Sequence, residues 1–171
     1  KLNVVKTAVG INTTLSGMEK ATGYGLRVED REISLNYCDA TRVIGVFEST
    51  NTDSPTLDRL TFPSGLNLNS TAVLGEQIVG DSSDAVAQIT GLISSTEVEI
   101  AYLTPTKFTT GEVCNFQESS ISTTLQLITV GNNLNITNRF ELDNGHREQF
   151  IDYSRIVRRV NFGPPTRKVL I

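Results

Sequence analysis

The chain has 171 residues, of which 38% are hydrophobic and 20% charged, and its formal net charge is −4. This length is enough for one domain of ordinary size or two small ones, each with a buried core. The acidic balance argues against nucleic-acid binding, which needs a concentrated basic face. No apolar stretch approaches the length of a membrane-spanning helix, so no membrane partner is expected.

The first third of the chain reads as a linker followed by short strands. Residues 1–24 are rich in Thr, Gly and Asn and are expected to form an N-terminal segment. Residues 25–35 suggest two strands around a turn at 29–31. The β-branched and aromatic run 43–47 is typical of a buried strand. A further short strand is predicted over 57–62, before Pro63.

Residues 70–130 contain a degenerate duplication. Each copy has a Gly-Glu pair, a Ser-Ser pair and a closing alternating run, at Gly75-Glu76, Ser82-Ser83 and 85–89 in the first copy and Gly111-Glu112, Ser119-Ser120 and 123–128 in the second. Two copies are fewer than a solenoid requires, so each is better interpreted as a β-hairpin. Between them, residues 97–103 alternate polar and apolar, the pattern of a half-buried strand.

The stretch from 136 to 159 organises the last part of the chain. An alternating run ends at Asp143-Asn144-Gly145, a strong turn signal because Asn and Gly tolerate positive φ. The only helix predicted for the chain follows, over 145–154, capped by Asn144 or Asp143. Alternation then resumes until 163–165, before a last strand over 167–171.

These patterns predict an all-β fold, with an antiparallel, sandwich-like architecture and at most one short helix. The expected organisation is an N-terminal segment (1–24), a main β-domain formed by 25–62 and 134–171, and an inserted hairpin subdomain (63–133). Both ends suggest that the chain is part of a longer polypeptide, since it begins with Lys1 and ends within an apparent strand.

Residues 140–155 match the pattern F-x-L-D-N-G-x-R-E-x-F-x-D-Y-x-R, and residues 39–49 match D-A-x-R-V-x-x-V-F-E-S. These motifs resemble a domain of the large virion structural proteins of T4-like tailed bacteriophages, mainly tail and baseplate proteins of phages of marine cyanobacteria. The resemblance covers 39–49 and 136–171, and the Gly-Glu hairpins loosely. His146 and Phe150 stand where that family more often has Gln and Tyr.

The resemblance implies a non-enzymatic module of a tail, baseplate or fibre, located in the virion and assembled in the host cytoplasm. Its partners would be other virion proteins and copies of itself, through unpaired strand edges such as 167–171. The structural signature is Asp143, Asn144, Gly145, Arg147, Asp152 and Tyr153. In this hypothesis Arg147 and Asp152 form ion pairs, while Phe150 and Tyr153 pack under the sheet.

The main alternative is a host-surface module that binds carbohydrate through exposed loops such as 49–56 or 64–70. The absence of Trp counts mildly against it. A depolymerase would need a carboxylate pair at a defined separation, for which Asp143 or Glu148 are candidates. His146, the only histidine, has no Gly-x-Ser-x-Gly motif to accompany it, so no catalytic triad is expected.

No metal or cofactor is expected. Zinc would require the isolated Cys38, Cys114 and His146 to converge. Calcium could use the oxygen-rich group Asp143, Asn144, Glu148 and Asp152, but a turn and cap explain the same residues. The two cysteines are expected to be free, mostly buried thiols. The basic cluster Arg155, Arg158, Arg159, Arg167 and Lys168 is expected to face outwards or to pair with the acidic segment 141–152.

Overall fold

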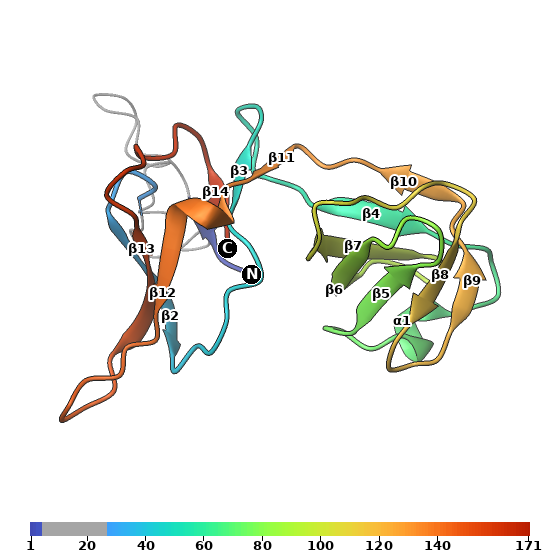
Figure 1. Cartoon of the computed structure of the whole chain (residues 1–171), viewed down its shortest axis with the longest axis horizontal. Coiled ribbons are helices and arrows are strands. Elements are labelled where there is room, and N and C mark those ends of the chain that lie inside the picture. Colours follow the sequence, from blue (N-terminus) through green and yellow to red (C-terminus); the bar gives the residue numbers. More distant parts are fainter. Residues whose placement is uncertain (5–26) are drawn as a thin grey trace. The chain divides into compact units, whose positions relative to one another are not determined.

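The computed structural model describes residues 1–4 and 27–171 of the chain. The chain divides into two compact units, which we call the flanking unit (Lys1–Thr56 and Asn132–Ile171) and the inserted unit (Leu57–Gly131). Antiparallel strands make up almost all of the regular structure (Figure 1), which confirms the all-β prediction. Most of the predicted N-terminal segment, residues 5–24, lies outside the described residues.

The flanking unit contains two small sheets that share one core. The first has the order β1-β14-β3-β11, formed by Asn3–Val4, Val169–Leu170, Phe47–Ser49 and Asn133–Asn135. The second has the order β12-β13-β2, formed by Phe140–Asp143, Tyr153–Arg158 and Glu32–Cys38. Both contribute to one buried cluster, which includes Val4 and Val169 from the first sheet and Ile33, Phe140 and Ile156 from the second. Sharing a core between two sheets is the principle of a sandwich.

The last strand is not an edge. β14 lies between β1 and β3 and pairs with both, Val169 with Val4 and with Glu48. The expectation that 167–171 offers an unpaired edge for β-addition is therefore wrong. The sequence of a short apolar strand does not reveal how many neighbours it has, because internal and edge strands can share the same composition.

Glu48 in β3 fixes the chain that leads into β14. Its carboxylate is buried and accepts hydrogen bonds from the backbone N–H groups of Thr166 (2.6 Å) and Arg167 (3.0 Å) and from the Thr166 hydroxyl (3.1 Å). Arg139, in the 3₁₀ turn η2 (Thr137–Arg139), lies 3.9 Å from the other carboxylate oxygen. These hydrogen bonds offset the cost of burying the charge.

The inserted unit is one curled sheet of seven strands, a half-barrel. The strands are β4 (Asp58–Thr61), β5 (Gln77–Gly80), β6 (Val86–Leu92), β7 (Glu97–Tyr102), β8 (Val113–Phe116), β9 (Ser122–Thr124) and β10 (Leu127–Thr129). Their order is β10-β4-β7-β6-β5-β8-β9. β9 and β10 are the two end strands of this sheet, yet they follow each other directly in the chain, within residues 122–129. The sheet must therefore curl until its two edges come close together.

Both predicted hairpins are present, as the pairs β5–β6 and β8–β9. The alternating run around β7 also forms a strand, with Val98 and Ile100 buried. β4 belongs to the inserted unit rather than to the main domain assigned from sequence, because it pairs with β7 and β10. The short helix α1 (Leu68–Thr71) buries Leu68 in the core of this unit.

We expect Glu48→Ala to destabilise the chain by about 2–3 kcal/mol, because two backbone N–H groups lose a charged acceptor. Chemical denaturation followed by circular dichroism measures this change. The matched control is Glu141→Ala, since Glu141 is exposed and its 3.2 Å contact with Arg159 is a surface ion pair. The control should cost less than about 1 kcal/mol, and equal losses for both variants would contradict the role given to Glu48.

Candidate functional site

The D-N-G stretch forms a β-hairpin rather than a helix. Residues 144–152 connect β12 to β13, and Figure 1 shows this hairpin extending away from the two sheets of its unit. The Asp152 N–H donates to the Gly145 carbonyl (2.8 Å), and His146 and Ile151 form an isolated antiparallel bridge. The predicted helix over 145–154 is therefore wrong. Helical spacing in a segment this short was outweighed by the pairing of its two ends.

Local turn chemistry explains how the hairpin forms. The Asp143 carboxylate accepts the N–H of Gly145 (3.0 Å), and the Asn144 side chain accepts the N–H of His146 (3.1 Å). Gly145 has a φ of 83°, and a Cβ there would collide with the carbonyl oxygen of Asp152. Both facts require glycine at this position.

The base of the hairpin is braced by a network of ion pairs. Arg147 donates two hydrogen bonds to Asp143, at 3.0 and 2.7 Å. Arg155 contacts three carboxylates: Asp152 at 2.7 Å, Glu32 at 2.9 Å and Asp143 at 3.2 Å. Arg147 and Asp152 thus form hydrogen-bonded ion pairs, as expected from the sequence. A shared network orders its side chains at lower entropic cost than separate surface pairs.

The network also fixes the ionisation of Asp143. The two hydrogen bonds from Arg147 are the largest influence on the pKa of Asp143, followed by the Gly145 N–H, and together they hold it far below its usual range. Asp143 is consequently a permanent anion near neutral pH, which suits a structural anchor.

Ser154 joins the two motifs of the sequence. Its buried hydroxyl accepts the N–H of Ala40 (2.8 Å) and donates to the carbonyl of Asn144 (2.9 Å). His146 Nε2 lies 2.7 Å from the Asp39 carboxylate. The motif that starts at Asp39 and the D-N-G motif therefore form one local structure. Sequence reasoning did not identify the role of Ser154, and the only signal was a small hydroxyl residue inside a strand.

Exposed apolar side chains lie in the hairpin and at the start of β13. Phe150 is 63% exposed, Ile151 60% and Tyr153 57%. The expectation that Phe150 and Tyr153 pack under the sheet is therefore wrong, because this part of the hairpin lies beyond the shared core. Tyr37, at the adjoining end of β2, is 67% exposed. We call Phe150 and Ile151 the hairpin tip.

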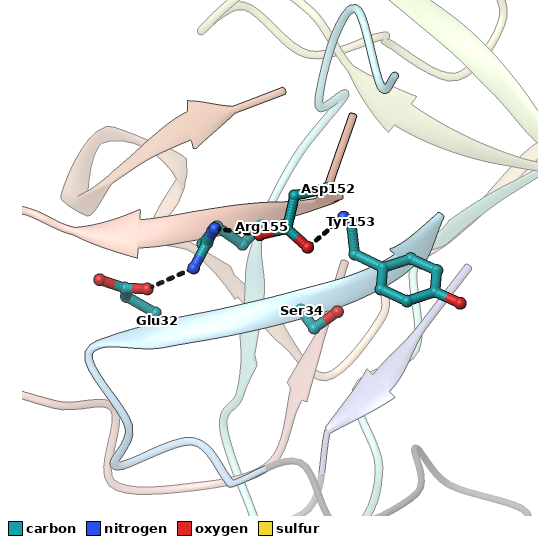
Figure 2. Close-up of a pocket in the computed structure, with 5 residues that line it drawn as sticks. All are labelled: Glu32, Ser34, Asp152, Tyr153 and Arg155. Atoms are coloured by element: carbon teal, nitrogen blue, oxygen red, sulfur yellow. Dashed lines mark hydrogen bonds and ion pairs between the residues drawn. The ribbon is translucent and has the colours of Figure 1, made fainter. Parts of the chain in front are cut away.

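A shallow pocket of about 260 Å³ lies on the β2–β13 face (Figure 2). It is lined by Glu32, Ser34, Asp152, Tyr153 and Arg155. Figure 2 shows Arg155 held between Glu32 and Asp152, with the Tyr153 ring at the other end of the pocket. The pocket therefore combines an exposed aromatic ring with polar groups in fixed positions. Sequence reasoning did not bring these residues together, since Glu32 and Ser34 lie far from the D-N-G motif.

The remaining candidates from the sequence are the possible metal ligands, the two cysteines and the basic cluster. Within residues 1–4 and 27–171, no group of three or more His, Cys, Asp or Glu side chains could hold a metal ion. Cys38 and Cys114 are free thiols, but Cys38 is exposed, contrary to expectation. Burial raises the pKa of Cys114 to about 12, so this thiol stays neutral. Arg155 and Arg159 of the basic cluster pair with carboxylates of the segment 141–152.

Comparison of the chain with models of protein families, with curated proteins and with solved structures finds no match. Among the described residues, no helix has the length and apolar character needed to cross a membrane. Function must therefore be inferred from the chemistry of the site rather than from the fold.

We expect Arg147→Ala to lower the thermal midpoint at pH 7, because Asp143 loses its two charge-assisted hydrogen bonds. A carboxylate with a lowered pKa in the folded state stabilises the protein above its unfolded pKa, and this contribution disappears as the pH falls through the folded value. The gap between wild type and variant should therefore narrow in strong acid. Thermal denaturation between pH 2 and 7 tests this.

The control for this experiment is Arg147→Lys, which keeps the charge but cannot donate in the same bidentate geometry. Its midpoint should lie between those of the wild type and Arg147→Ala. An Arg147→Ala midpoint equal to that of the wild type at every pH would contradict the bracing role.

Proposed function

We propose that the chain is a non-enzymatic structural module of a bacteriophage virion, in the tail, baseplate or fibre. It would be assembled in the host cytoplasm and act by contacting neighbouring virion proteins and copies of itself. The observation that carries this proposal is the hairpin, whose base is braced by ion pairs while its tip exposes Phe150 and Ile151.

The hairpin has the features of a protein contact site. A partner that covers the two adjacent apolar side chains of the tip would remove apolar surface from water, which favours binding. Rigid presentation lowers the entropic cost of binding, and aromatic residues contribute strongly at interfaces. Five residues of the pattern that resembles the virion motif help to build the brace: Asp143, Gly145, Arg147, Asp152 and Arg155.

The same contacts favour a structural over a catalytic role for the carboxylates. A glycosidase acid needs a raised pKa, so that the group is protonated near neutral pH. Arg147 and the Gly145 N–H instead lower the pKa of Asp143. Asp152 is bound to Arg155 and to the N–H of Tyr153. Both groups serve to hold the hairpin in this proposal.

We expect the double variant Phe150→Ser, Ile151→Ser to weaken self-association of the chain by about tenfold or more, because it removes the apolar contact surface. Sedimentation velocity over a range of protein concentrations measures this. Val160→Ser is the matched control, since Val160 is 82% exposed in the same unit but lies outside the hairpin. Equal sedimentation of wild type, double variant and control would count against assembly through the tip.

A second candidate function, binding of host-surface carbohydrate, is favoured by the pocket on β2 and β13. Sugars bind through an aromatic ring that covers their C–H face and through fixed polar groups that bond their hydroxyls. Tyr153 offers such a ring, and Ser34, Glu32 and Asp152 offer polar atoms beside it. This site differs from the loops 49–56 and 64–70 suggested by the sequence.

If the pocket binds sugar, D-glucose, D-galactose or N-acetyl-D-glucosamine should show saturation transfer from the protein in NMR experiments. Tyr153→Ala should abolish the transfer. Tyr37→Ala should preserve it, because Tyr37 is also an exposed tyrosine but does not line the pocket. Absence of transfer to all three sugars would remove the support that the pocket gives to this second candidate.

A further inference from the structure

The two hairpin copies of the inserted unit correspond position by position. In the structure the second copy follows the first with an offset of 36 positions, as Gly111 follows Gly75. Ser119 is therefore the counterpart of Ser83, and the pairing of Ser82-Ser83 with Ser119-Ser120 inferred from the sequence is displaced by one residue. Gly75 and Gly111 have φ values of 94° and 93°, and the turn residues Asp84 and Ser120 have 52° and 58°. A left-handed conformation at matching positions is not expected by chance, particularly at residues other than glycine.

The backbone hydrogen bonds repeat with the same offset. Four backbone hydrogen bonds of the first copy have counterparts of nearly equal length in the second. The Gly75 N–H donates to Ile89 as Gly111 does to Leu125, and the Ile89 N–H donates to Glu76 as Leu125 does to Glu112. The Gly80 N–H donates to Ala85 as Phe116 does to Ile121, and the Asp81 N–H donates to Val113 as Gln117 does to Gln77. The irregularities also match. β6 changes register between Ile89 and Gly91, and the equivalent run is interrupted between β9 and β10.

The copies meet about a local twofold axis. β5 pairs antiparallel with its counterpart β8, and Val79 stands opposite Asn115, its own equivalent. β4 pairs with β7, and Thr61 stands opposite Glu97, again its own equivalent. Antiparallel pairing of equivalent residues is the arrangement found at the axis of a twofold-symmetric dimer.

Each copy supplies a buried glutamate that holds the turn of the other. Glu76 accepts the N–H of Ser119 (3.0 Å) and its hydroxyl (3.0 Å), and also the N–H of Glu118 (3.1 Å). Glu112 accepts the N–H of Ser83 (3.1 Å) and its hydroxyl (2.9 Å). Each glutamate also accepts an N–H three residues before itself, from Val73 and from Thr109.

We infer that the inserted unit is a fused homodimer, formed by residues 58–93 and 94–129, two copies of one element that interlock about a twofold axis. The surface of each copy is complementary to that of the other, so the partner it fits is a second copy of the same element. α1 has no counterpart, since the equivalent residues 104–107 form no helix. This inference is independent of the proposed function.

Double-mutant cycles in the full chain test the exchange of glutamates. We expect Ser119→Ala to lower the thermal midpoint in the wild type and in Glu112→Gln, but to have little further effect in Glu76→Gln. Ser83→Ala should show the reverse, with its effect lost only in Glu112→Gln. The coupling should be similar in size for the two pairs. Additive losses, or coupling of each serine to the glutamate of its own copy, would overturn the inference.

Interchangeability of the copies is tested by a full chain in which 58–93 and 94–129 exchange places. The new junction between the copies joins residue 129 to residue 58. Thr129 stands opposite Arg59 in the β10–β4 pair, so the joined positions are already close. We expect a single cooperative unfolding transition and cross-strand nuclear Overhauser contacts between the β5 and β8 sequences. An exchanged chain that does not fold would overturn the inference.

Discussion

Buried glutamate carboxylates that accept backbone N–H groups are the interaction on which both units depend. Glu48 holds the segment before β14, while Glu76 and Glu112 hold the turns of the opposite copies. Each contact joins segments that are distant in sequence. A buried carboxylate is costly unless several donors surround it, so each glutamate favours only the arrangement in which its donors converge.

The opposing effects of burial and hydrogen bonding on a carboxylate are clearest at Glu112. Burial raises the pKa of this carboxyl, but the hydrogen bonds from Thr109, Ser83 and Ser82 together outweigh that effect and leave the pKa below its usual value. Glu112 therefore stays ionised near neutral pH. Its contribution to stability is present above the unfolded pKa and is lost as the pH falls through the folded value.

The features that the sequence predicted well are local. Alternation identified β7, and the Gly-Glu and Ser-Ser pairs identified both hairpins, because side-chain period and turn chemistry act over a few residues. The D-N-G turn was identified for the same reason. Long-range relations were not predicted. Nothing local reveals that Glu76 bonds to Ser119, or that β14 lies between two strands.

The errors at the candidate site have a common physical cause. The segment around Phe150 has helical spacing, and aromatic residues usually pack in a core. Pairing across the hairpin, from Gly145 to Asp152, outweighed that weak local preference and carried Phe150 beyond the core. The sequence thus identified the residues of the brace but misplaced the apolar tip, which is the part that carries the proposed contacts.

We propose that the ion pairs around Asp143 and Arg155 hold the hairpin so that its tip contacts copies of the chain, while buried glutamates fix the strands within each unit. Amide hydrogen exchange of the full chain, measured by NMR at low and high protein concentration, tests it most directly. The amides of Ser83, Ser119 and Arg167 should exchange slowly at both concentrations, while those of residues 146–151 should become slower as concentration rises. Fast exchange at the three glutamate-bound amides, or tip exchange that does not depend on concentration, would contradict the account.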